Sequence, residues 1–228
     1  MNIALILAGG TGKCFGSSYP RQYISVKGKM IISYSLETFA DHPRIAAIQV
    51  VAQEQWREKV YKQMPDAVLR KFAGFSDPGS NRQRSVFQGL NDMAGYARKD
   101  DVVIIHDAVR PMVTAAQISA CLKACKRHDG VVPVLSVKDT VYFGEGGTIC
   151  SLAERDKLFT GQSPEAFLLG KYYRANTKLI PDRIDEIINS AEPAVMAGLD
   201  IAMIPGDEDN FKVTTRVDLE RFKLSLDT

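Results

Sequence analysis

Residues 2–22 read Asn-Ile-Ala-Leu-Ile-Leu-Ala-Gly-Gly-Thr-Gly-Lys-Cys-Phe-Gly-Ser-Ser-Tyr-Pro-Arg-Gln, and this stretch decides the fold. Its first part, residues 2–8, is apolar at every position after Asn2, which is typical of strands buried on both faces of a parallel sheet. Glycines follow at once, and their small size lets backbone N–H groups approach the oxygens of a phosphate. Lys13 and Arg21 add positive charge. The stretch therefore predicts a buried strand followed by a phosphate-binding loop.

The glycine spacing matches neither of two common phosphate-binding signatures. The P-loop pattern needs a Lys-Ser/Thr ending, which this loop lacks. The dinucleotide-binding pattern needs a different glycine spacing and an acidic residue that closes the second strand, where this chain has Ala52-Gln53-Glu54. The glycine loop is thus expected to belong to neither class.

The composition is that of an ordinary globular domain, with 45% hydrophobic and 25% charged residues. A chain of 228 residues is long enough for a full core, and we expect a single domain over residues 1–228. The formal net charge of +2 comes without a long basic run, which argues against nucleic-acid binding. No run of 18 apolar residues occurs and the N-terminus already predicts a strand, so no membrane span or signal peptide is expected.

The four cysteines, Cys14, Cys121, Cys125 and Cys150, do not have the spacing of a zinc site. We expect them to be reduced thiols in a cytoplasmic protein.

Apolar runs of strand length alternate with segments of helical period along the chain. This alternation predicts a three-layer, Rossmann-like α/β fold with a mostly parallel sheet. Strands are expected over 2–8, 45–52, 70–75, 101–106, 130–137 and 200–204, and helices over 31–40, 53–64, 82–97, 114–128, 168–179, 182–197 and 217–226.

A different pattern begins after Lys138. Residues 140–143 and 148–153 flank a Gly144-Glu145-Gly146-Gly147 turn, which predicts a β-hairpin. We expect this hairpin to be the tip of an arm over about 138–160 that protrudes from the domain. Arms of this kind usually reach a partner subunit, so a homodimer is predicted.

Polar clusters follow several predicted strands, at 8–22, 76–85, 106–110, 138–140 and 206–215. Ligands of open parallel sheets bind beyond the carboxyl ends of the strands, so these loops are expected to form one pocket. Arg82 and Arg84 begin a helix, where a bound anion would offset their unfavourable charge, and Ser85 offers a hydroxyl to the same anion.

Asp107 is the strongest candidate for a functional carboxylate, because it directly follows an apolar strand. Together with Asp209 it could hold a Mg²⁺ that bridges a triphosphate. The alternative is that Asp107 pairs with Arg110 or caps the following segment. Lys212 is either neutralised by the acids at 207–209 or reaches a phosphate, and His106 is expected to be structural rather than catalytic.

The chain carries seven polar or glycine-rich motifs in the following order: Leu7-Ala8-Gly9-Gly10-Thr11-Gly12, Pro20-Arg21-Gln22, Arg82-x-x-Ser85-Val86, His106-Asp107-Ala108-Val109-Arg110-Pro111, Lys138-Asp139-Thr140, Gly161-Gln162-Ser163-Pro164 and Asn210-Phe211-Lys212-Val213-Thr214-Thr215. As a set they resemble the cytidylyltransferases of polyol phosphates, over essentially the whole chain. This family has branches for D-ribitol 5-phosphate and for 2-C-methyl-D-erythritol 4-phosphate, and the first and sixth motifs look more like the ribitol branch.

The resemblance implies a nucleotidyltransferase fold and transfer of CMP from CTP to a polyol phosphate, with Mg²⁺ and release of pyrophosphate. Its product would be a precursor of isoprenoids or of teichoic acid and other cell-surface polymers. By motif, Lys13, Arg21 and Lys212 would be catalytic, and Asp107 would hold the metal. Arg110, Thr140, Arg155 and Gln162 would bind the polyol phosphate, with Thr140 and Arg155 acting in the partner subunit's site. The CTP contacts would be Leu7, Ala8, Gly9, Gly10, Thr11, Gly12, Gly79, Ser80, Arg82, Ser85, His106, Asp107 and Ala108.

The chain departs from the family pattern at three places. Cys14 stands where the family has an arginine, Arg21 where it has a lysine, and Ile188-Asn189 where a Thr-Asp pair is expected. Arginine keeps the charge of lysine but presents a planar fork. Three hypotheses follow: an active cytidylyltransferase, a catalytically silent relative that binds nucleotide or a partner enzyme, and a nucleotidyltransferase for another nucleotide or sugar phosphate.

Overall fold

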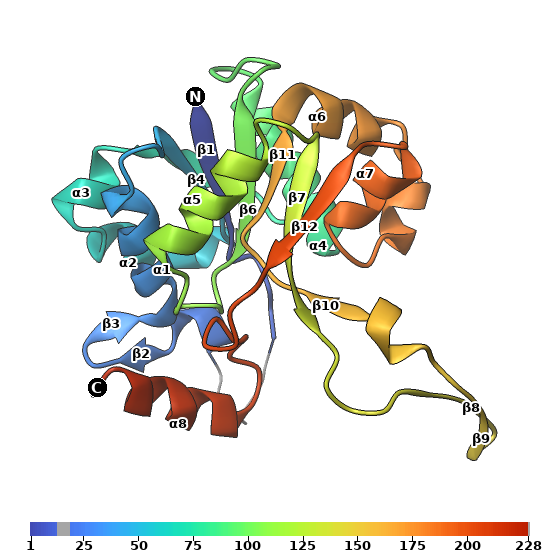
Figure 1. Ribbon diagram of the computed structural model, residues 1–228. Helices are drawn as coiled ribbons and strands as arrows, with labels where there is room; N and C mark the ends of the chain where they lie inside the picture. The colour runs from blue at the N-terminus through green and yellow to red at the C-terminus, as the bar shows by residue number, and fades with distance from the viewer. Residues whose placement is uncertain (13–18, 228) are drawn as a thin grey trace.

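The computed structural model describes residues 1–12 and 19–227, and its centre is one sheet of eight strands (Figure 1). From β11 the strands follow the order β11-β6-β1-β4-β5. On the other side of β11 lies β7, whose one edge pairs with β11 and then β10, and whose opposite edge pairs with β12. The sheet is mostly parallel, as predicted, and only β10 and β11 run against their neighbours. The strands are β1 Asn2–Leu7, β4 Ala47–Val51, β5 Phe72–Ser76, β6 Val102–Asp107, β7 Gly130–Ser136, β10 Phe159–Gly161, β11 Glu165–Leu168 and β12 Ile201–Pro205.

Strand β1 is the central strand that the opening stretch predicts. Its residues 3–6 have no exposed surface, because β4 and β6 flank it in parallel and helices cover both faces. The register places Leu7 beside Val51 of β4 and Asp107 of β6. The loops that follow these three strands therefore leave the sheet at one common edge.

Helices cover the two faces of the sheet and form the outer layers. One apolar cluster joins Ile6 and Ile48 to the helices on the face that is in front in Figure 1, and a second joins Leu5 and Ile105 to the helices behind. In front lie α1 Ile31–Asp41, α2 Glu54–Lys62, α3 Asp66–Leu69 and α5 Ala115–Ala124, and behind lie α4 Arg82–Met93, α6 Leu169–Thr177 and α7 Ala191–Met196.

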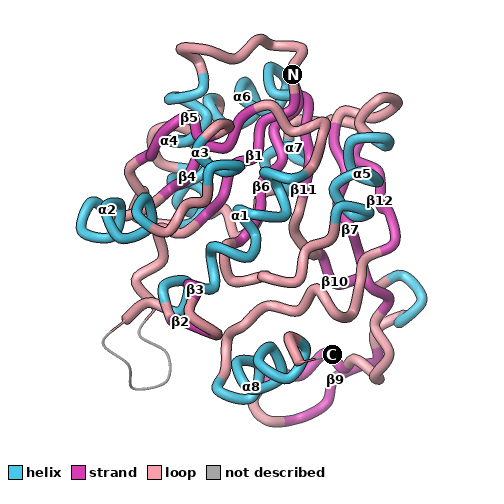
Figure 2. The backbone as a smooth tube through the Cα atoms, turned by 90° about the vertical axis from the view of Figure 1, so that its left-hand side faces the viewer, coloured by secondary structure: helices cyan, strands magenta, loops and turns pink. Residues whose placement is uncertain are grey.

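The last helix, α8 Arg216–Ser225, stands apart from these layers. It lies below the sheet beside the small hairpin of β2 Ser25–Val26 and β3 Lys29–Met30 (Figure 2). Phe222 and Leu219 pack there against Val26 and Ile31. A capping box of Thr215 and Asp218 begins the helix. Within the described part of the chain, no helix combines the length and apolar character that a bilayer span needs.

The structure differs from the sequence-based expectation between residues 159 and 197. Strands β10 and β11 were not expected, because β11 has only four residues and its apolar run continues directly into α6. The helix predicted over 182–197, with an interruption near Pro193, is instead a 3₁₀ turn at Arg183–Glu186 and the short helix α7, which contains Pro193. The helix α3 and the β2–β3 hairpin were also missed.

The predicted hairpin is present and forms a sheet of its own. Strands β8 Tyr142–Glu145 and β9 Thr148–Leu152 pair across a turn in which Gly146 and Gly147 have φ of 57° and 82°. These left-handed conformations favour glycine. The hairpin protrudes from the rest of the chain, at the lower right of Figure 1. Large apolar side chains on it are exposed, namely Tyr142, Phe143, Ile149 and Leu152.

We predict that Leu5→Ala lowers the free energy of unfolding by about 2–5 kcal/mol, because it opens a cavity between β1 and α4. The midpoint of urea unfolding at constant m measures this. The matched control is Leu224→Ala on α8, where the side chain is 68% exposed and the change should stay within about 0.5 kcal/mol. Equal effects in the two variants would contradict the central role of β1.

Candidate active site

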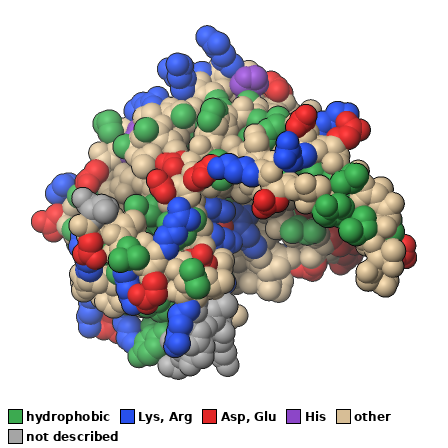
Figure 3. Space-filling view, turned by 60° about the horizontal axis from the view of Figure 1, so that its bottom comes forward, with side chains coloured by type: hydrophobic (Ala, Val, Ile, Leu, Met, Phe, Trp, Pro, Cys, Tyr) green, Lys and Arg blue, Asp and Glu red, His purple; other side chains and the backbone are tan. Residues whose placement is uncertain are grey.

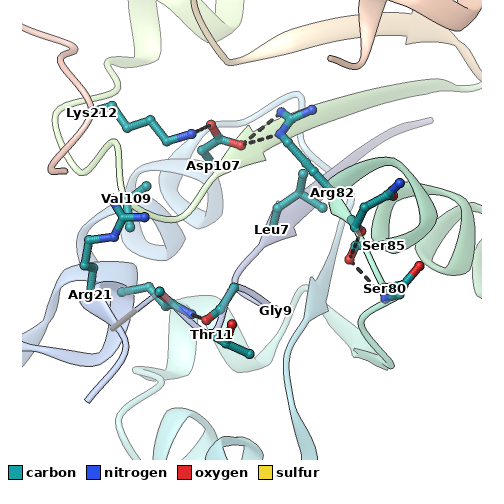
Figure 4. A pocket seen from close by; sticks show the side chains of 15 residues that line it. Leu7, Gly9, Thr11, Arg21, Ser80, Arg82, Ser85, Asp107, Val109 and Lys212 are labelled. Atoms are coloured by element: carbon teal, nitrogen blue, oxygen red, sulfur yellow. Dashed lines mark hydrogen bonds and ion pairs between the residues drawn. The ribbon is translucent and has the colours of Figure 1, made fainter. Parts of the chain in front are cut away.

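Two adjoining cavities open at the edge of the sheet where β1 and β6 end. The glycine-loop cavity has a volume of about 290 Å³, and the second cavity has about 410 Å³. Arg82, Asp107 and Lys212 line both cavities (Figure 4). Basic side chains gather at the hollow beside the arm in Figure 3. Of the predicted CTP contacts and catalytic residues, the glycine-loop cavity brings together Leu7, Gly9, Gly10, Thr11, Gly12, Arg21, Gly79, Ser80, Arg82, Ser85, Asp107 and Lys212.

The glycine loop is held at its base by Gln22. The Gln22 side-chain amide donates to the carbonyl oxygens of Ala8 at 2.6 Å and Gly10 at 2.7 Å, and the Tyr23 hydroxyl donates to Ala8 at 2.8 Å. A glycine is required at position 9, since a Cβ there would lie 2.5 Å from the Cβ of Pro78. Gln22 was not predicted as a site residue, although it is the last residue of the Pro-Arg-Gln motif.

The start of α4 closes the opposite side of this cavity. Asn81 caps the helix by accepting from the N–H of Arg84 at 2.7 Å. The Ser85 hydroxyl accepts from the N–H of Gly79 at 3.0 Å and donates to the carbonyl of Asn81 at 2.8 Å. These bonds fix the shape of the turn that follows β5. Arg84 points away and pairs with Asp185.

Asp107, the last residue of β6, is the centre of the charged groups. Arg82 donates to its Oδ1 from Nε at 3.1 Å and from Nη2 at 2.9 Å, and Lys212 donates to Oδ2 at 2.9 Å. Burial by itself raises the pKa of Asp107, but Arg82, Lys212 and Arg110 hold that pKa well below its usual range. Asp107 is therefore ionised at neutral pH, and its partners are Arg82 and Lys212 rather than Arg110 alone.

Some predicted residues lie behind the cavities instead of lining them. His106 is fully buried, with Nδ1 3.3 Å from the Ser163 hydroxyl and Nε2 3.0 Å from the carbonyl of Arg110. Burial lowers the pKa of His106 to about 4, so the imidazole is neutral and structural. Ala8 and Ala108 are buried as well and line neither cavity. The geometry does not support direct nucleotide contacts from these three side chains.

The second cavity contains two of the predicted polyol-phosphate residues. Arg110 lines it, and its Nη1 donates to the carbonyl of Asn210 at 2.7 Å. Gln162 also lines it, but both ends of its amide bond the backbone of Asp207, each at 2.9 Å. Ser163, Glu165, Ile188 and Asn189 line this cavity too, and none of them was proposed as a polyol-phosphate contact.

Three further predicted residues line neither cavity of their own chain. Thr140 and Arg155 lie together on the arm, and their predicted role in the partner subunit's site stays a prediction. Asp209 lies outside both cavities and pairs with Arg221, so the geometry does not bring it to Asp107. Within the described residues, no group of three or more potential metal-ligating side chains occurs. Lys13 and the Cys14 departure lie outside the described residues.

The charges of the two cavities suit anionic ligands. Arg21, Arg82, Arg110 and Lys212 face only two carboxylates, Asp107 and Glu165, among the described lining residues. Two adjoining basic cavities that share an ionised carboxylate lie at the strand ends of a Rossmann-like α/β fold, and their charge suits phosphorylated ligands.

Comparison with known proteins identifies the family. The family model described as 2-C-methyl-D-erythritol 4-phosphate cytidylyltransferase (IspD) matches residues 2–227. The chain is 33% identical over 225 residues to the bifunctional enzyme IspD/IspF of Paramagnetospirillum magneticum, over 99% of this chain and 56% of that protein. It is 29% identical over 229 residues to a ribitol-5-phosphate cytidylyltransferase of Streptococcus agalactiae, over 100% of this chain and 96% of that protein.

A solved structure agrees with this match. The Francisella tularensis 2-C-methyl-D-erythritol 4-phosphate cytidylyltransferase superposes with a TM-score of 0.83 at 25% identity, over 98% of each chain. The chain therefore belongs to the 2-C-methyl-D-erythritol 4-phosphate cytidylyltransferase family, and the predicted family resemblance and α/β fold are confirmed. The chain spans about half the length of the bifunctional relatives that it matches.

We predict that the buried, neutral His106 makes stability depend on pH. Because the folded-state pKa of about 4 lies below the unfolded value of 6.5, its contribution is complete above pH 6.5 and is lost as the pH falls towards 4. The free energy of unfolding should fall by about 2 kcal/mol between pH 7 and pH 5 from this group alone. His106→Gln should flatten that slope in urea titrations, and Leu224→Ala, an exposed change that removes no titratable group, should keep it. Equal slopes in the wild type and in His106→Gln would contradict the assignment.

Proposed function

We propose that the protein transfers CMP from CTP to a polyol phosphate and releases pyrophosphate. The observation that carries this proposal is the placement of Asp107, Arg82 and Lys212 on the wall that the two cavities share. CTP occupies the glycine-loop cavity and the polyol phosphate occupies the second cavity. The two substrates then meet at the shared wall, in agreement with the cytidylyltransferase names of the relatives.

The proposed reaction is an in-line displacement at phosphorus. An oxygen of the polyol phosphate attacks the α-phosphorus of CTP, and the bond from that phosphorus to the bridging oxygen of the β-phosphate breaks. The ionised acceptor phosphate needs no general base. The protein's task is to place two anions together and to neutralise the charge that develops, for which Arg21 and Lys212 are available.

We further propose that Mg²⁺ takes part and that Asp107 is its protein ligand. Mg²⁺ on nucleotides commonly uses one or two carboxylates, with phosphate oxygens and water as its other ligands. The ionised Asp107 fits this requirement, and Asp209 is not needed for it. When bound, the ion would neutralise charge on the triphosphate oxygens. Arg82 donates twice to Oδ1 of Asp107 and Lys212 donates once to Oδ2, so Oδ2 keeps a second lone pair for the ion.

The acceptor is proposed to be D-ribitol 5-phosphate, with 2-C-methyl-D-erythritol 4-phosphate as the alternative. The loop sequence Leu7 to Gly12 and the Gly161 to Pro164 segment favour the first. The family model and the bifunctional relatives favour the second. Ile188 and Asn189, where a Thr-Asp pair was expected, line the second cavity, and they are therefore placed to affect the choice.

We also propose that the protein is a cytoplasmic homodimer joined through its arms. The exposed apolar side chains of the hairpin support this, because they would be buried against a second chain. Thr140 and Arg155 lie on the arm and outside their own chain's cavities, so a swapped arm would deliver them to the partner's acceptor site.

The first test measures pyrophosphate release from CTP with Mg²⁺ and each candidate acceptor. We expect release with at least one acceptor and a loss of about 100-fold or more in kcat/KM for Asp107→Asn, because a central charged group is removed. Asp209→Asn should change the rate less than about twofold, since Asp209 lies outside both cavities. CTP binding without turnover would instead favour the silent relative, and turnover with UTP or ATP would favour another nucleotidyltransferase.

A second test concerns the arm. Sedimentation equilibrium should give twice the mass of the chain for the wild type, and Phe143→Asp with Ile149→Asp should shift it towards the monomer and raise KM for the polyol phosphate. Both side chains are at least 60% exposed in the single chain, so the fold itself should not suffer. Leu224→Asp, equally exposed but on α8, is the control that should stay dimeric. A monomeric wild type would rule out the arm-joined dimer.

A further inference from the structure

One carboxylate in the second cavity has no role in the proposed transfer of CMP. Glu165 is the first residue of β11 and is only 7% exposed. Because β11 runs antiparallel to β6, its first residue lies at the sheet edge where the parallel strands end, and Glu165 pairs in register with Ile105. Glu165 lines the second cavity together with Arg110 and Asn189.

The neighbours of Glu165 leave one of its two carboxylate oxygens without a hydrogen bond. Its Oε2 lies 3.6 Å from Nη2 of Arg82, beyond hydrogen-bond distance, and accepts no hydrogen bond from any described residue. Arg82 itself is committed to Asp107 and to the Ser190 hydroxyl. Burial raises the pKa of Glu165, although Arg82 and a hydrogen bond from the Ser190 hydroxyl to the carboxyl group oppose that rise. A buried acceptor of this kind is costly unless something donates to it.

Arg110, which lines the same cavity, has an unpaired hydrogen-bond donor. Its Nε is buried and has no hydrogen-bond partner among the described residues. Glu165 and Arg110 are the only lining residues of the second cavity with such an atom, within the part of the chain that the structure describes. An unpaired acceptor and an unpaired donor on one cavity indicate a ligand that offers both a donor and an acceptor.

The charges limit which group of the ligand meets Glu165. A carboxylate repels a phosphate, so the phosphate belongs with the cations Arg110, Arg82 and Lys212. A hydroxyl group is neutral and can donate a hydrogen bond to a carboxylate oxygen. A sugar alcohol that carries one phosphate has both kinds of group.

We propose that Glu165 is a specificity-determining residue, whose carboxylate accepts a hydrogen bond from one hydroxyl of the acceptor polyol. This inference rests on the proposed function, since it assigns the acceptor to the second cavity. It predicts that the enzyme rejects a phosphorylated acceptor that lacks this hydroxyl, because Glu165 would then stay buried and unpaired.

The test uses CTP with D-ribitol 5-phosphate, 2-C-methyl-D-erythritol 4-phosphate and the monodeoxy analogues of whichever acceptor is turned over. Removal of one particular hydroxyl should lower the wild-type kcat/KM by about 10- to 100-fold, as expected for a hydrogen bond to a charged group. In Glu165→Gln the loss for that same analogue should shrink to a few-fold. KM for CTP should stay within about twofold in this variant, because Glu165 does not line the glycine-loop cavity.

The matched control is Glu220→Gln, an exposed carboxylate of α8 that pairs with Lys223 and should behave as the wild type. A variant that raises KM for CTP and not for the acceptor would show that Glu165 acts only through Arg82, and the proposal would be wrong. If Glu165→Gln does not fold, the analogue series with the wild type decides alone. A series in which the removal of no single hydroxyl lowers kcat/KM by about 10-fold or more would overturn the proposal. A wild type that turns over neither acceptor refutes the proposed function itself, whereas turnover with identical analogue profiles in both enzymes refutes only the role of Glu165.

Discussion

The arrangement of the site depends on one buried negative charge. Asp107 ends a strand that is flanked by two others, and a carboxylate in that position is stable only when cations compensate for its lost hydration. Arg82 comes from the start of α4 and Lys212 from the loop before α8. The need of Asp107 for compensating cations therefore brings together segments that are far apart in sequence. These contacts also place positive charge at the strand ends in advance, which the proposed transfer of CMP would need for electrostatic stabilisation.

Much of this arrangement could be predicted from the sequence. A fully apolar strand has few alternatives to the middle of a parallel sheet, and the ends of parallel strands must meet at one edge. Four of the five loops that were expected to share a pocket, at 8–22, 76–85, 106–110 and 206–215, contribute to the glycine-loop cavity. The fifth, 138–140, begins the arm and lines neither cavity, so the expectation was wrong for that loop. The hairpin of the arm could also be predicted from the sequence, because its glycines occupy the positions where the turn needs positive φ.

The elements that could not be predicted from the sequence are defined by pairing between strands that are distant along the chain. Strand β11 is too short to show a period, and only its two neighbours in the sheet make it a strand. Glu165 was missed with it, since nothing in Gln-Ser-Pro-Glu shows that the chain turns back to the strand-end edge. Asp209 is the reverse case, a predicted site residue that lines neither cavity. Its position in a loop after a strand favoured a metal ligand, but its side chain pairs with Arg221.

The bonds made by Gln22 have a consequence for the electrostatics of the glycine loop. Gln22 donates to the carbonyls of Ala8 and Gly10, so its amide hydrogens offset the partial negative charge of these two oxygens. A loop whose carbonyls are already paired repels an approaching anion less than one whose carbonyls are free. A neutral side chain thereby makes the cavity more favourable for an anion without adding a cation.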